Sequence, residues 1–253
     1  MEEKNPIQVA DRLFQTLELL AENGTMGLMN ISETMELNKS TTHRILNSLI
    51  YMGYAKQDDE TGKYELTMKL VRLSNQIMGR VDMIQIVRPY LRQLVDITNE
   101  TVHFVKMEGV DAVYIDKVES YSNAAQMVSR IGSRTPLYCS GVGKSIMAEL
   151  KEREVKNIWD VSSITGRTPN TITDFRKFKA CLKEIKEKGY ALDNEENEIG
   201  VRCIAVSLSE IDGNDKYAFS ISAPVGRMSD ERIRELKDYI LETKQKICAA
   251  IGI

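Results

Sequence analysis

The spacing of apolar residues predicts three helices within the first 51 residues of the chain. In the first, apolar side chains recur every three or four residues, at Val9, Leu13, Phe14, Leu17 and Leu20. This helix is expected over 8–22, with Asn23-Gly24 ending it. Shorter apolar patterns predict a second helix over 31–35 and a third over 40–51.

Polar residues and glycines mark where these helices begin and end. The candidate N-caps are Asn30 or Ser32 for the second helix and Asn38 or Ser40 for the third. Gly53 ends the third helix, and two strand patterns follow over 54–56 and 63–66, around a turn at Thr61-Gly62. Three helices and a hairpin are the layout of a winged helix-turn-helix, so residues 1–67 are predicted to be a DNA-binding domain.

The pattern changes beyond this hairpin. A helical segment over 68–78 leads to Asp82, after which helices and strands mix without strict alternation. Residues 68–82 are therefore expected to form a linker helix, and residues 83–253 an α+β domain. Its predicted helices cover 83–98, 142–150, 152–161, 174–188 and 230–250, with Pro89 bending or restarting the first. Its predicted strands cover 101–107, 111–117, 125–129, 201–208 and 217–221.

The beginning of the third helix is rich in hydroxyl and basic side chains. A helix that presents such groups from its first turns and packs its apolar face inward is suited to the major groove of DNA. The residues expected to reach bases or phosphates are Lys39, Ser40, Thr41, Thr42, His43, Arg44 and Asn47, and Lys63 in the turn should touch the DNA backbone. The alternative is a three-helix core that binds no ligand.

The charge balance argues against nucleic-acid binding, but only at the level of the whole domain. The net charge is −3, and the first 66 residues carry six basic against eleven acidic residues. Between Leu37 and Gln57, however, there are three basic residues and no acid. Since phosphate binding depends on the local surface, modest affinity per subunit and dimeric binding are expected. A protein-interaction module with an acidic face is the competing interpretation.

The composition is that of an ordinary globular protein, with 42% hydrophobic and 28% charged residues. No apolar run approaches the roughly 20 residues of a membrane span, and no secretory signal is recognisable. The cysteines, Cys139, Cys181, Cys203 and Cys248, lack the short spacing of a metal site. A cytoplasmic protein with free thiols, no metal, no cofactor and no membrane partner is expected.

Residues 138–145 invite comparison with a phosphate-binding loop. The spacing excludes it, because Tyr138 stands where that motif needs its first glycine. What remains is a turn of small residues leading into a helix, whose first N–H groups suit a carboxylate better than a nucleotide. A turn required only for packing is the alternative.

Other polar positions of the second domain were each open to a structural explanation. The acidic stretch 193–198 lacks the pattern of a metal loop and is expected to be solvated, except that Asp193 follows apolar residues and can point inward. Cys203 lies in a buried-strand pattern without a histidine to activate it, so a small buried thiol is favoured over a nucleophile. Ser220 and Ser222 share one side of a strand, which is either a pocket floor or a solvent face.

These segments together resemble the IclR family of bacterial transcription regulators, over nearly the whole chain. In the first domain the resemblance rests on KSTTHRIL (39–46) and the hairpin residues 53–54 and 61–64. In the second it rests on VYIDKV (113–118), RIGSRTPL (130–137), SGVGK (140–144), GYALDNEE (189–196), GVRCIA (200–205) and ISAP (221–224). The order and spacing of the segments make the match specific.

The resemblance implies a GAF-like α+β effector-binding domain that takes a small organic acid or keto acid. By the family pattern, the ligand contacts fall on Gly141, Val142, Asp193, Cys203, Ser220 and Ser222. Among the subgroups of the family, those that respond to keto-deoxy sugar acids look similar to this chain. Two departures are Thr42, where a β-branched apolar residue is common, and Ala223, where glycine often follows Ser222; neither removes an expected ligand donor.

The expected function is a ligand-responsive transcription regulator, more a repressor than an activator, of a carbon-catabolism operon. The expected partners are double-stranded operator DNA, a small organic acid or keto sugar acid, and further copies of the chain in a dimer or a dimer of dimers. No catalytic residue is predicted. The main competitor is an enzyme that transforms a small molecule with Cys203 or Ser140 as its nucleophile.

Overall fold

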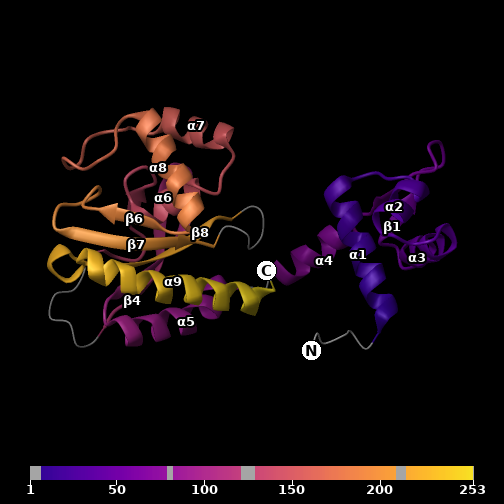
Figure 1. Cartoon of the computed structure of the whole chain (residues 1–253), viewed down its shortest axis with the longest axis horizontal. Helices are drawn as coiled ribbons and strands as arrows, with labels where there is room; N and C mark the ends of the chain where they lie inside the picture. Colours follow the sequence, from indigo (N-terminus) through magenta and orange to yellow (C-terminus); the bar gives the residue numbers. More distant parts are fainter. Residues whose placement is uncertain (1–6, 79–81, 121–128, 209–214, 253) are drawn as a thin grey trace. The chain divides into compact units, whose positions relative to one another are not determined.

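The computed structural model describes residues 7–78, 82–120, 129–208 and 215–252. The chain divides into two compact units, Met1–Val81 and Asp82–Ile253 (Figure 1). The strand predicted over 125–129 falls largely on residues outside those described. Across the described part of the chain, no helix is both long and apolar enough to span a lipid bilayer.

The N-terminal unit is a winged helix-turn-helix, as predicted. Its elements are α1 (Gln8–Asn23), α2 (Leu28–Thr34), α3 (Lys39–Tyr51), β1 (Ala55–Gln57), β2 (Tyr64–Leu66) and α4 (Lys69–Met78). Strands β1 and β2 pair antiparallel with Ala55 opposite Leu66. Buried side chains from the helices and the hairpin, including Leu20, Ile31, Leu46 and Tyr64, form its core.

The structure decides between the alternative helix caps. Asn38 caps α3, since its side-chain oxygen accepts a hydrogen bond of 2.8 Å from the N–H of Thr41. The prediction for α2 was wrong: the helix begins at Leu28 after Gly27, and Ser32 is buried within it. A two-residue apolar pattern was too short to locate the beginning of a seven-residue helix.

The C-terminal unit has the predicted α+β fold. Its helices are α5 (Met83–Thr98), α6 (Gly141–Met147), α7 (Glu152–Val161), α8 (Phe175–Lys188), η1 (Val225–Arg227) and α9 (Asp230–Ile251). Its strands are β3 (Thr101–Glu108), β4 (Asp111–Val118), β5 (Arg134–Pro136), β6 (Ala191–Asn194), β7 (Val201–Ser207) and β8 (Tyr217–Pro224). Among the described residues these strands form one antiparallel sheet in the order β5-β4-β3-β8-β7-β6.

Two strands differ from the predictions, and one helix excludes one of two expected outcomes. Strands β5 and β6 were not predicted, because three or four residues at the sheet edges carry too little alternation to be recognised. Helix α5 continues through Pro89 without a restart, which was one of the two expected outcomes. A proline costs one backbone hydrogen bond, and here burial of the helix's apolar face against β4 and α9 offsets that loss.

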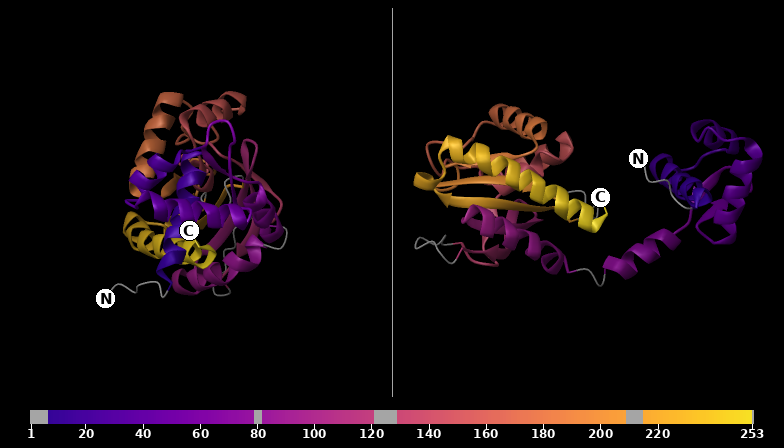
Figure 2. Two further views of the ribbon diagram at one scale, coloured as in Figure 1. Left: turned by 90° about the vertical axis from the view of Figure 1, so that its right-hand side faces the viewer. Right: turned by 60° about the horizontal axis from the view of Figure 1, so that its bottom comes forward.

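Helices cover both faces of the sheet. Helices α5 and α9 lie side by side on one face, and α6 lies against the other, with α7 and α8 outside it (Figures 1 and 2). Between α6 and the sheet, small residues such as Ala205 and Ala218 allow close packing. Trp159 packs against Phe178 with ring centroids 4.7 Å apart and supports the outer layer.

Candidate functional site

The first candidate site is the exposed face of α3. The side chains of Lys39, Ser40, His43, Arg44 and Asn47 are exposed along this face. Asn47 donates to the Nδ1 atom of His43 over 3.3 Å, so these two side chains present one polar surface. Thr41 is half-buried beside them, and Lys63 is exposed in the turn between β1 and β2.

Thr42 corrects the predicted DNA-binding set. Its side chain is 1% exposed, and its hydroxyl donates to the carbonyl oxygen of Asn38 over 3.2 Å. Thr42 lies three and four residues before Ile45 and Leu46, which places it on the inward face of the helix. It therefore packs in the core and cannot contact DNA directly.

The acids of the hairpin have structural partners. The Asp58 carboxylate accepts hydrogen bonds of 2.7 Å from both the side chain and the N–H of Thr61, and these hold the pKa of Asp58 below its usual value. Glu65 pairs with Lys56 at 2.8 Å. The Asp58 carboxylate thus stabilises the turn that carries Lys63, and Lys56 partly neutralises the charge of Glu65.

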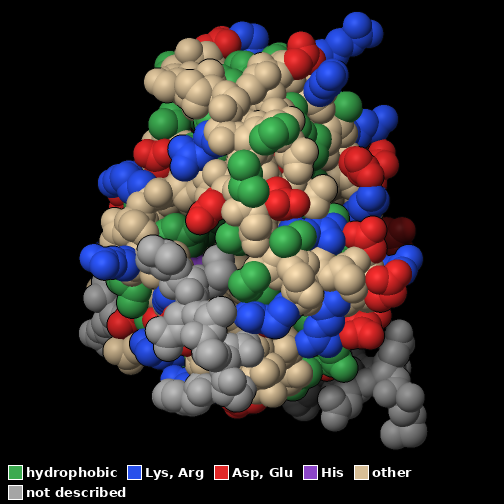
Figure 3. All heavy atoms as spheres, turned by 90° about the vertical axis from the view of Figure 1, so that its left-hand side faces the viewer, with side chains coloured by type: hydrophobic (Ala, Val, Ile, Leu, Met, Phe, Trp, Pro, Cys, Tyr) green, Lys and Arg blue, Asp and Glu red, His purple; other side chains and the backbone are tan. Residues whose placement is uncertain are grey.

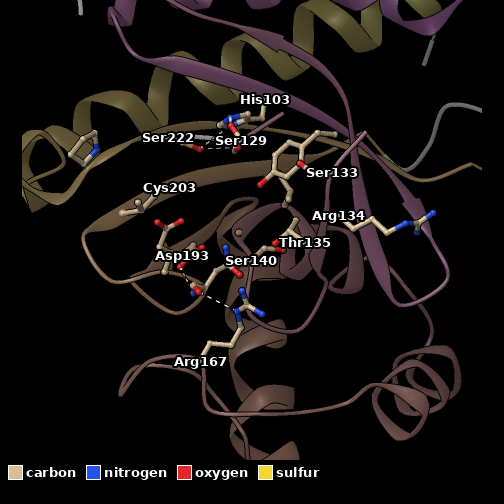
Figure 4. Close-up of a pocket in the computed structure, with 18 residues that line it drawn as sticks. His103, Ser129, Ser133, Arg134, Thr135, Ser140, Arg167, Asp193, Cys203 and Ser222 are labelled. Atoms are coloured by element: carbon tan, nitrogen blue, oxygen red, sulfur yellow. Dashed lines mark hydrogen bonds between the residues drawn. The ribbon is translucent and has the colours of Figure 1, made fainter. Parts of the chain in front are cut away.

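The second candidate site is a cavity of about 460 Å³ in the C-terminal unit (Figure 4). It is lined by the beginning of α6 and by residues of the sheet. The residues named as ligand contacts from the resemblance all line it: Gly141, Val142, Asp193, Cys203, Ser220 and Ser222. The structure thus brings together positions up to 81 residues apart in the sequence; that they contact a ligand stays a prediction.

Close packing positions α6 at the cavity wall. The hydroxyl of Ser140 donates to the carbonyl of Pro136 over 2.7 Å and accepts from the N–H of Gly143, which fixes the beginning of the helix. A Cβ atom on Gly143 would lie 2.3 Å from backbone atoms of Leu137, so only glycine fits there. The first N–H groups of an α-helix have no partners within it, and in α6 these belong to Gly141 and Val142, which line the cavity.

Ser220 and Ser222 on β8 line the cavity. Their side of the strand is therefore the floor of a pocket and not a face exposed to solvent. Ser220 and Ser222 are 3% and 2% exposed, and their hydroxyls lie 3.2 Å apart. His103 on β3 joins them: its Nδ1 atom lies 3.2 Å from the hydroxyl of Ser222 and its Nε2 atom 2.6 Å from that of Ser129. The floor is a buried network of hydroxyls around one imidazole.

His103 was not predicted as a site residue. Burial lowers its pKa to about 3, and the nearby charge of Lys117 adds to the effect, so the ring is neutral at physiological pH. A neutral imidazole offers one donor and one acceptor to hydroxyl groups. A single histidine between Val102 and Phe104 was the only signal in the sequence, and it does not distinguish a core residue from a ligand contact.

Asp193 points inward, as expected. It is 4% exposed, and its Oδ1 atom accepts hydrogen bonds from the N–H groups of Glu196 (2.8 Å) and Asn197 (3.3 Å). Burial raises the pKa of Asp193 to about 6, although these hydrogen bonds act in the opposite direction.

The acidic stretch 193–198 is not a fully solvated loop, contrary to the expectation. Glu196 is 7% exposed and forms an ion pair with Lys144, which is 1% exposed on α6. This buried pair ties the stretch to the helix, while Asn194 and Glu198 remain exposed. The sequence offered no means of knowing which of the neighbouring acids would meet a buried lysine.

Comparisons with known protein families give one match for each of the two units of the chain. Residues 9–59 match the IclR helix-turn-helix domain, and residues 75–249 match the family described as bacterial transcriptional regulator IclR C-terminal. The second match alone covers more than half of the chain. This protein belongs to the IclR family.

Similar regulators of this family span the full chain. The HTH-type transcriptional regulator KdgR of Escherichia coli is 35% identical over 252 residues, covering 99% of this chain and 95% of that protein. The DNA-binding transcriptional repressor YiaJ of the same organism is 37% identical and covers 89% of this chain and 80% of its own length. The IclR crystal structure from Thermotoga maritima is 31% identical, with a TM-score of 0.64, 97% of this chain and 99% of that chain covered. The predicted similarity to the KdgR subgroup is confirmed.

Membership of a family of DNA-binding regulators rejects the enzyme interpretation, and the site supports that result. Burial and the nearby Asp193 raise the pKa of the Cys203 thiol far above its usual value, so the thiolate required for attack is absent at neutral pH. The Ser140 hydroxyl is engaged with Pro136 and Gly143. The ring nitrogens of His103 are bonded to Ser222 and Ser129.

Several lining residues were missed because they come from elements that the sequence did not reveal. Arg134 and Thr135 lie on the short strand β5, and Arg167 lies in the loop between α7 and α8. Tyr114 is on β4, where it packs edge-on against His103 with ring centroids 5.0 Å apart. Alternation along β4 predicts the strand but not the direction in which Tyr114 points.

Proposed function

We propose that this IclR-family protein represses a carbon-catabolism operon and that a small organic or keto sugar acid controls its binding to operator DNA. The observation that carries the proposal is the pairing of an exposed polar helix face in one unit with a buried, hydroxyl-rich cavity in the other. Such a regulator acts where the chromosome is, in the bacterial cytoplasm.

The cavity supports a sugar acid over a two- or three-carbon acid. Its volume of about 460 Å³ lies in the lower part of the range that holds whole small-molecule ligands. Hydroxyl groups line it from several elements, at Ser129, Ser133, Ser140, Ser220 and Ser222. Hydroxyls and a neutral imidazole recognise the hydroxyls of a ligand by reciprocal hydrogen bonds. Asp193, Cys203 and the N–H groups of Gly141 and Val142 complete the proposed contacts.

We propose a dimer, and a dimer of dimers, as the DNA-binding form. Large apolar side chains are exposed on α1 and α4: Phe14 is 61% exposed and Val71 45%. Exposed apolar residues on neighbouring helices indicate a surface that another subunit covers. Two copies of α3 would then read two half-sites of a pseudo-palindromic operator. Residues 68–82 would serve as the linker between the domains 1–67 and 83–253.

Replacing Arg44 with alanine is expected to weaken operator binding by about tenfold to a hundredfold, since one charge-bearing DNA contact per subunit is lost. Fluorescence anisotropy with the protein's own promoter fragment measures the effect at several salt concentrations. Arg176→Ala on α8 removes an exposed arginine from the other unit and should leave the affinity unchanged. If the affinity of the wild-type protein for DNA depends neither on the salt concentration nor on the DNA sequence, the result would instead support a protein-interaction module.

Replacing Ser222 with alanine is expected to abolish the effect of keto-deoxy sugar acids on operator binding, because a donor in the floor of the cavity is lost. Basal DNA binding should persist, since α3 belongs to the other compact unit. Ser145→Ala is the matched control: its hydroxyl is equally buried and bonds the carbonyl of Val142, but it does not line the cavity. Loss of the response in both variants would assign Ser222 a structural role.

A further inference from the structure

The cavity is lined by two arginines that differ in their partners. Arg134 on β5 pairs with Glu108 at 2.6 Å, and its side chain points away from the other labelled residues in Figure 4. Arg167, in the loop between α7 and α8, extends its guanidinium toward Ser140 and the cavity (Figure 4). Among the described residues no carboxylate pairs with Arg167; its Nε atom donates to the carbonyl of Asn197 over 3.2 Å. The other nitrogens of its guanidinium can therefore bind a ligand.

Other basic groups near the cavity are not suited to bind an anion. The imidazole of His103 is neutral, because burial lowers its pKa to about 3. Lys144 is buried against Glu196 and does not line the cavity. On the face of this unit drawn in Figure 3, basic and acidic side chains are interspersed, so that surface as a whole does not select one sign of ligand charge. Selection for an acid must come from within the cavity.

The carboxylates that line the cavity favour a cation near the acid group of a ligand. Asp193 and Glu198 both contribute to the lining, and like charges at short range oppose each other. An acid ligand would meet this repulsion on entry unless a positive group offset it. Arg167 is the lining cation that is placed to do so.

The loop that carries Arg167 is held in place by hydrogen bonds to the stretch that follows Asp193. Side chains of the loop bond successive carbonyl oxygens there: Asn170 to Asn194 at 3.0 Å, Thr168 to Glu195 at 2.6 Å, Thr171 to Glu196 at 2.6 Å and Arg167 to Asn197 at 3.2 Å. The Thr171 hydroxyl also accepts the N–H of Arg167 over 3.1 Å, which fixes the backbone of that residue. A side chain held from a fixed backbone loses less entropy on binding a ligand.

We propose that Arg167 binds the acid group of the effector and thereby selects acids over uncharged compounds of the same size. The inference rests on the proposed sugar-acid effector and adds the residue that binds its negatively charged group. A guanidinium binds a carboxylate through two parallel charge-assisted hydrogen bonds. The hydroxyls of the ligand would then be left to the serines and His103 on the floor of the cavity.

Isothermal titration of the full chain with D-gluconate, 2-keto-3-deoxy-D-gluconate and D-sorbitol tests this assignment, since D-sorbitol carries a hydroxymethyl group in place of the gluconate carboxylate. Wild-type protein should bind at least one acid about tenfold or more tightly than D-sorbitol. Arg167→Gln should weaken binding of that acid by about tenfold to a hundredfold and leave the affinity for D-sorbitol unchanged. Arg167→Lys should restore part of the preference, because the charge is kept and the bidentate geometry is lost.

Arg134→Gln is the matched control, and its affinity for the acid should stay within about twofold of the wild-type value because Arg134 already has a carboxylate partner. Equal acid affinity in Arg167→Gln and wild type overturns the role of Arg167 and leaves the sugar-acid proposal standing. If Arg167→Gln weakens the binding of the acid and of D-sorbitol equally, Arg167 shapes the loop instead, and the proposal that it binds the acid group is overturned. A wild-type protein that binds neither acid overturns the effector class itself.

Discussion

Replacing Gly143 with alanine is expected to lower the free energy of unfolding of the C-terminal unit by at least about 3 kcal/mol, or to prevent its folding. The added Cβ atom would lie 2.3 Å from both the Cα and the carbonyl oxygen of Leu137. Backbone atoms cannot rotate away as the end of a flexible side chain can. Helix α6 would have to shift relative to the turn that contains Leu137, and the cavity wall formed by Gly141 and Val142 would shift with it.

Urea denaturation followed by tryptophan fluorescence measures this effect, since Trp159, the single tryptophan, lies in the C-terminal unit. Gly166→Ala is the control, because no atom lies within 4 Å of the position its Cβ would take. Gly141→Ala should fall between the two, since its Cβ would lie 3.3 Å from that of Ala205. An unfolding midpoint for Gly143→Ala equal to that of Gly166→Ala would show that α6 has more room than its contacts indicate.

Replacing Asp193 with asparagine is expected to stabilise the protein by up to roughly 3 kcal/mol at pH 7 while removing the response to the effector. Burial raises the pKa of Asp193 from 3.8 to about 6, so the folded state binds its proton more tightly than the unfolded state. The contribution of this group to stability is therefore most favourable below pH 4 and declines as the pH rises to about 6. Asparagine keeps the oxygen that accepts from Glu196 and Asn197 and never ionises.

The pH dependence separates this explanation from a general gain in packing. Urea midpoints of wild type and Asp193→Asn should coincide near pH 4, diverge between pH 4 and 6, and stay apart above it. Asp238→Asn changes a carboxylate that is 78% exposed on α9 and should follow the wild-type profile. A constant difference between Asp193→Asn and wild type at all pH values would contradict the assigned cause.

Much of the N-terminal unit could be predicted because its signals are local. Asn38 caps α3 through an atom three residues away, and the inward apolar residues of that helix repeat within two turns. Thr42 was included among the DNA-contacting candidates because its hydroxyl suggested a surface role, although it lies on the same helix face as Ile45 and Leu46. The structure buries it, and the other candidates stay predictions. Counting helical positions from Ile45 would have placed it inside.

The cavity was predictable only in part. The resemblance pointed to six lining residues but not to His103 and Arg167. Strand pairing brings His103 to the cavity, and Arg167 comes from a loop that has no periodic pattern in the sequence. Lys144 and Glu196 show the same limit, because a buried ion pair requires two residues 52 positions apart to meet. No pattern in a single sequence reports that meeting.

The sequence by itself determined the helix-turn-helix, the α+β character of the second domain and the family, because these depend on propensity, spacing and the order of short motifs. The tertiary structure alone decided which polar residues are buried, which way each strand faces and which lining arginine has no carboxylate partner among the described residues. These properties arise only when segments distant in the sequence come into contact. The charge state and the orientation of each side chain then depend on burial in a low dielectric and on close packing, and not on its neighbours along the chain.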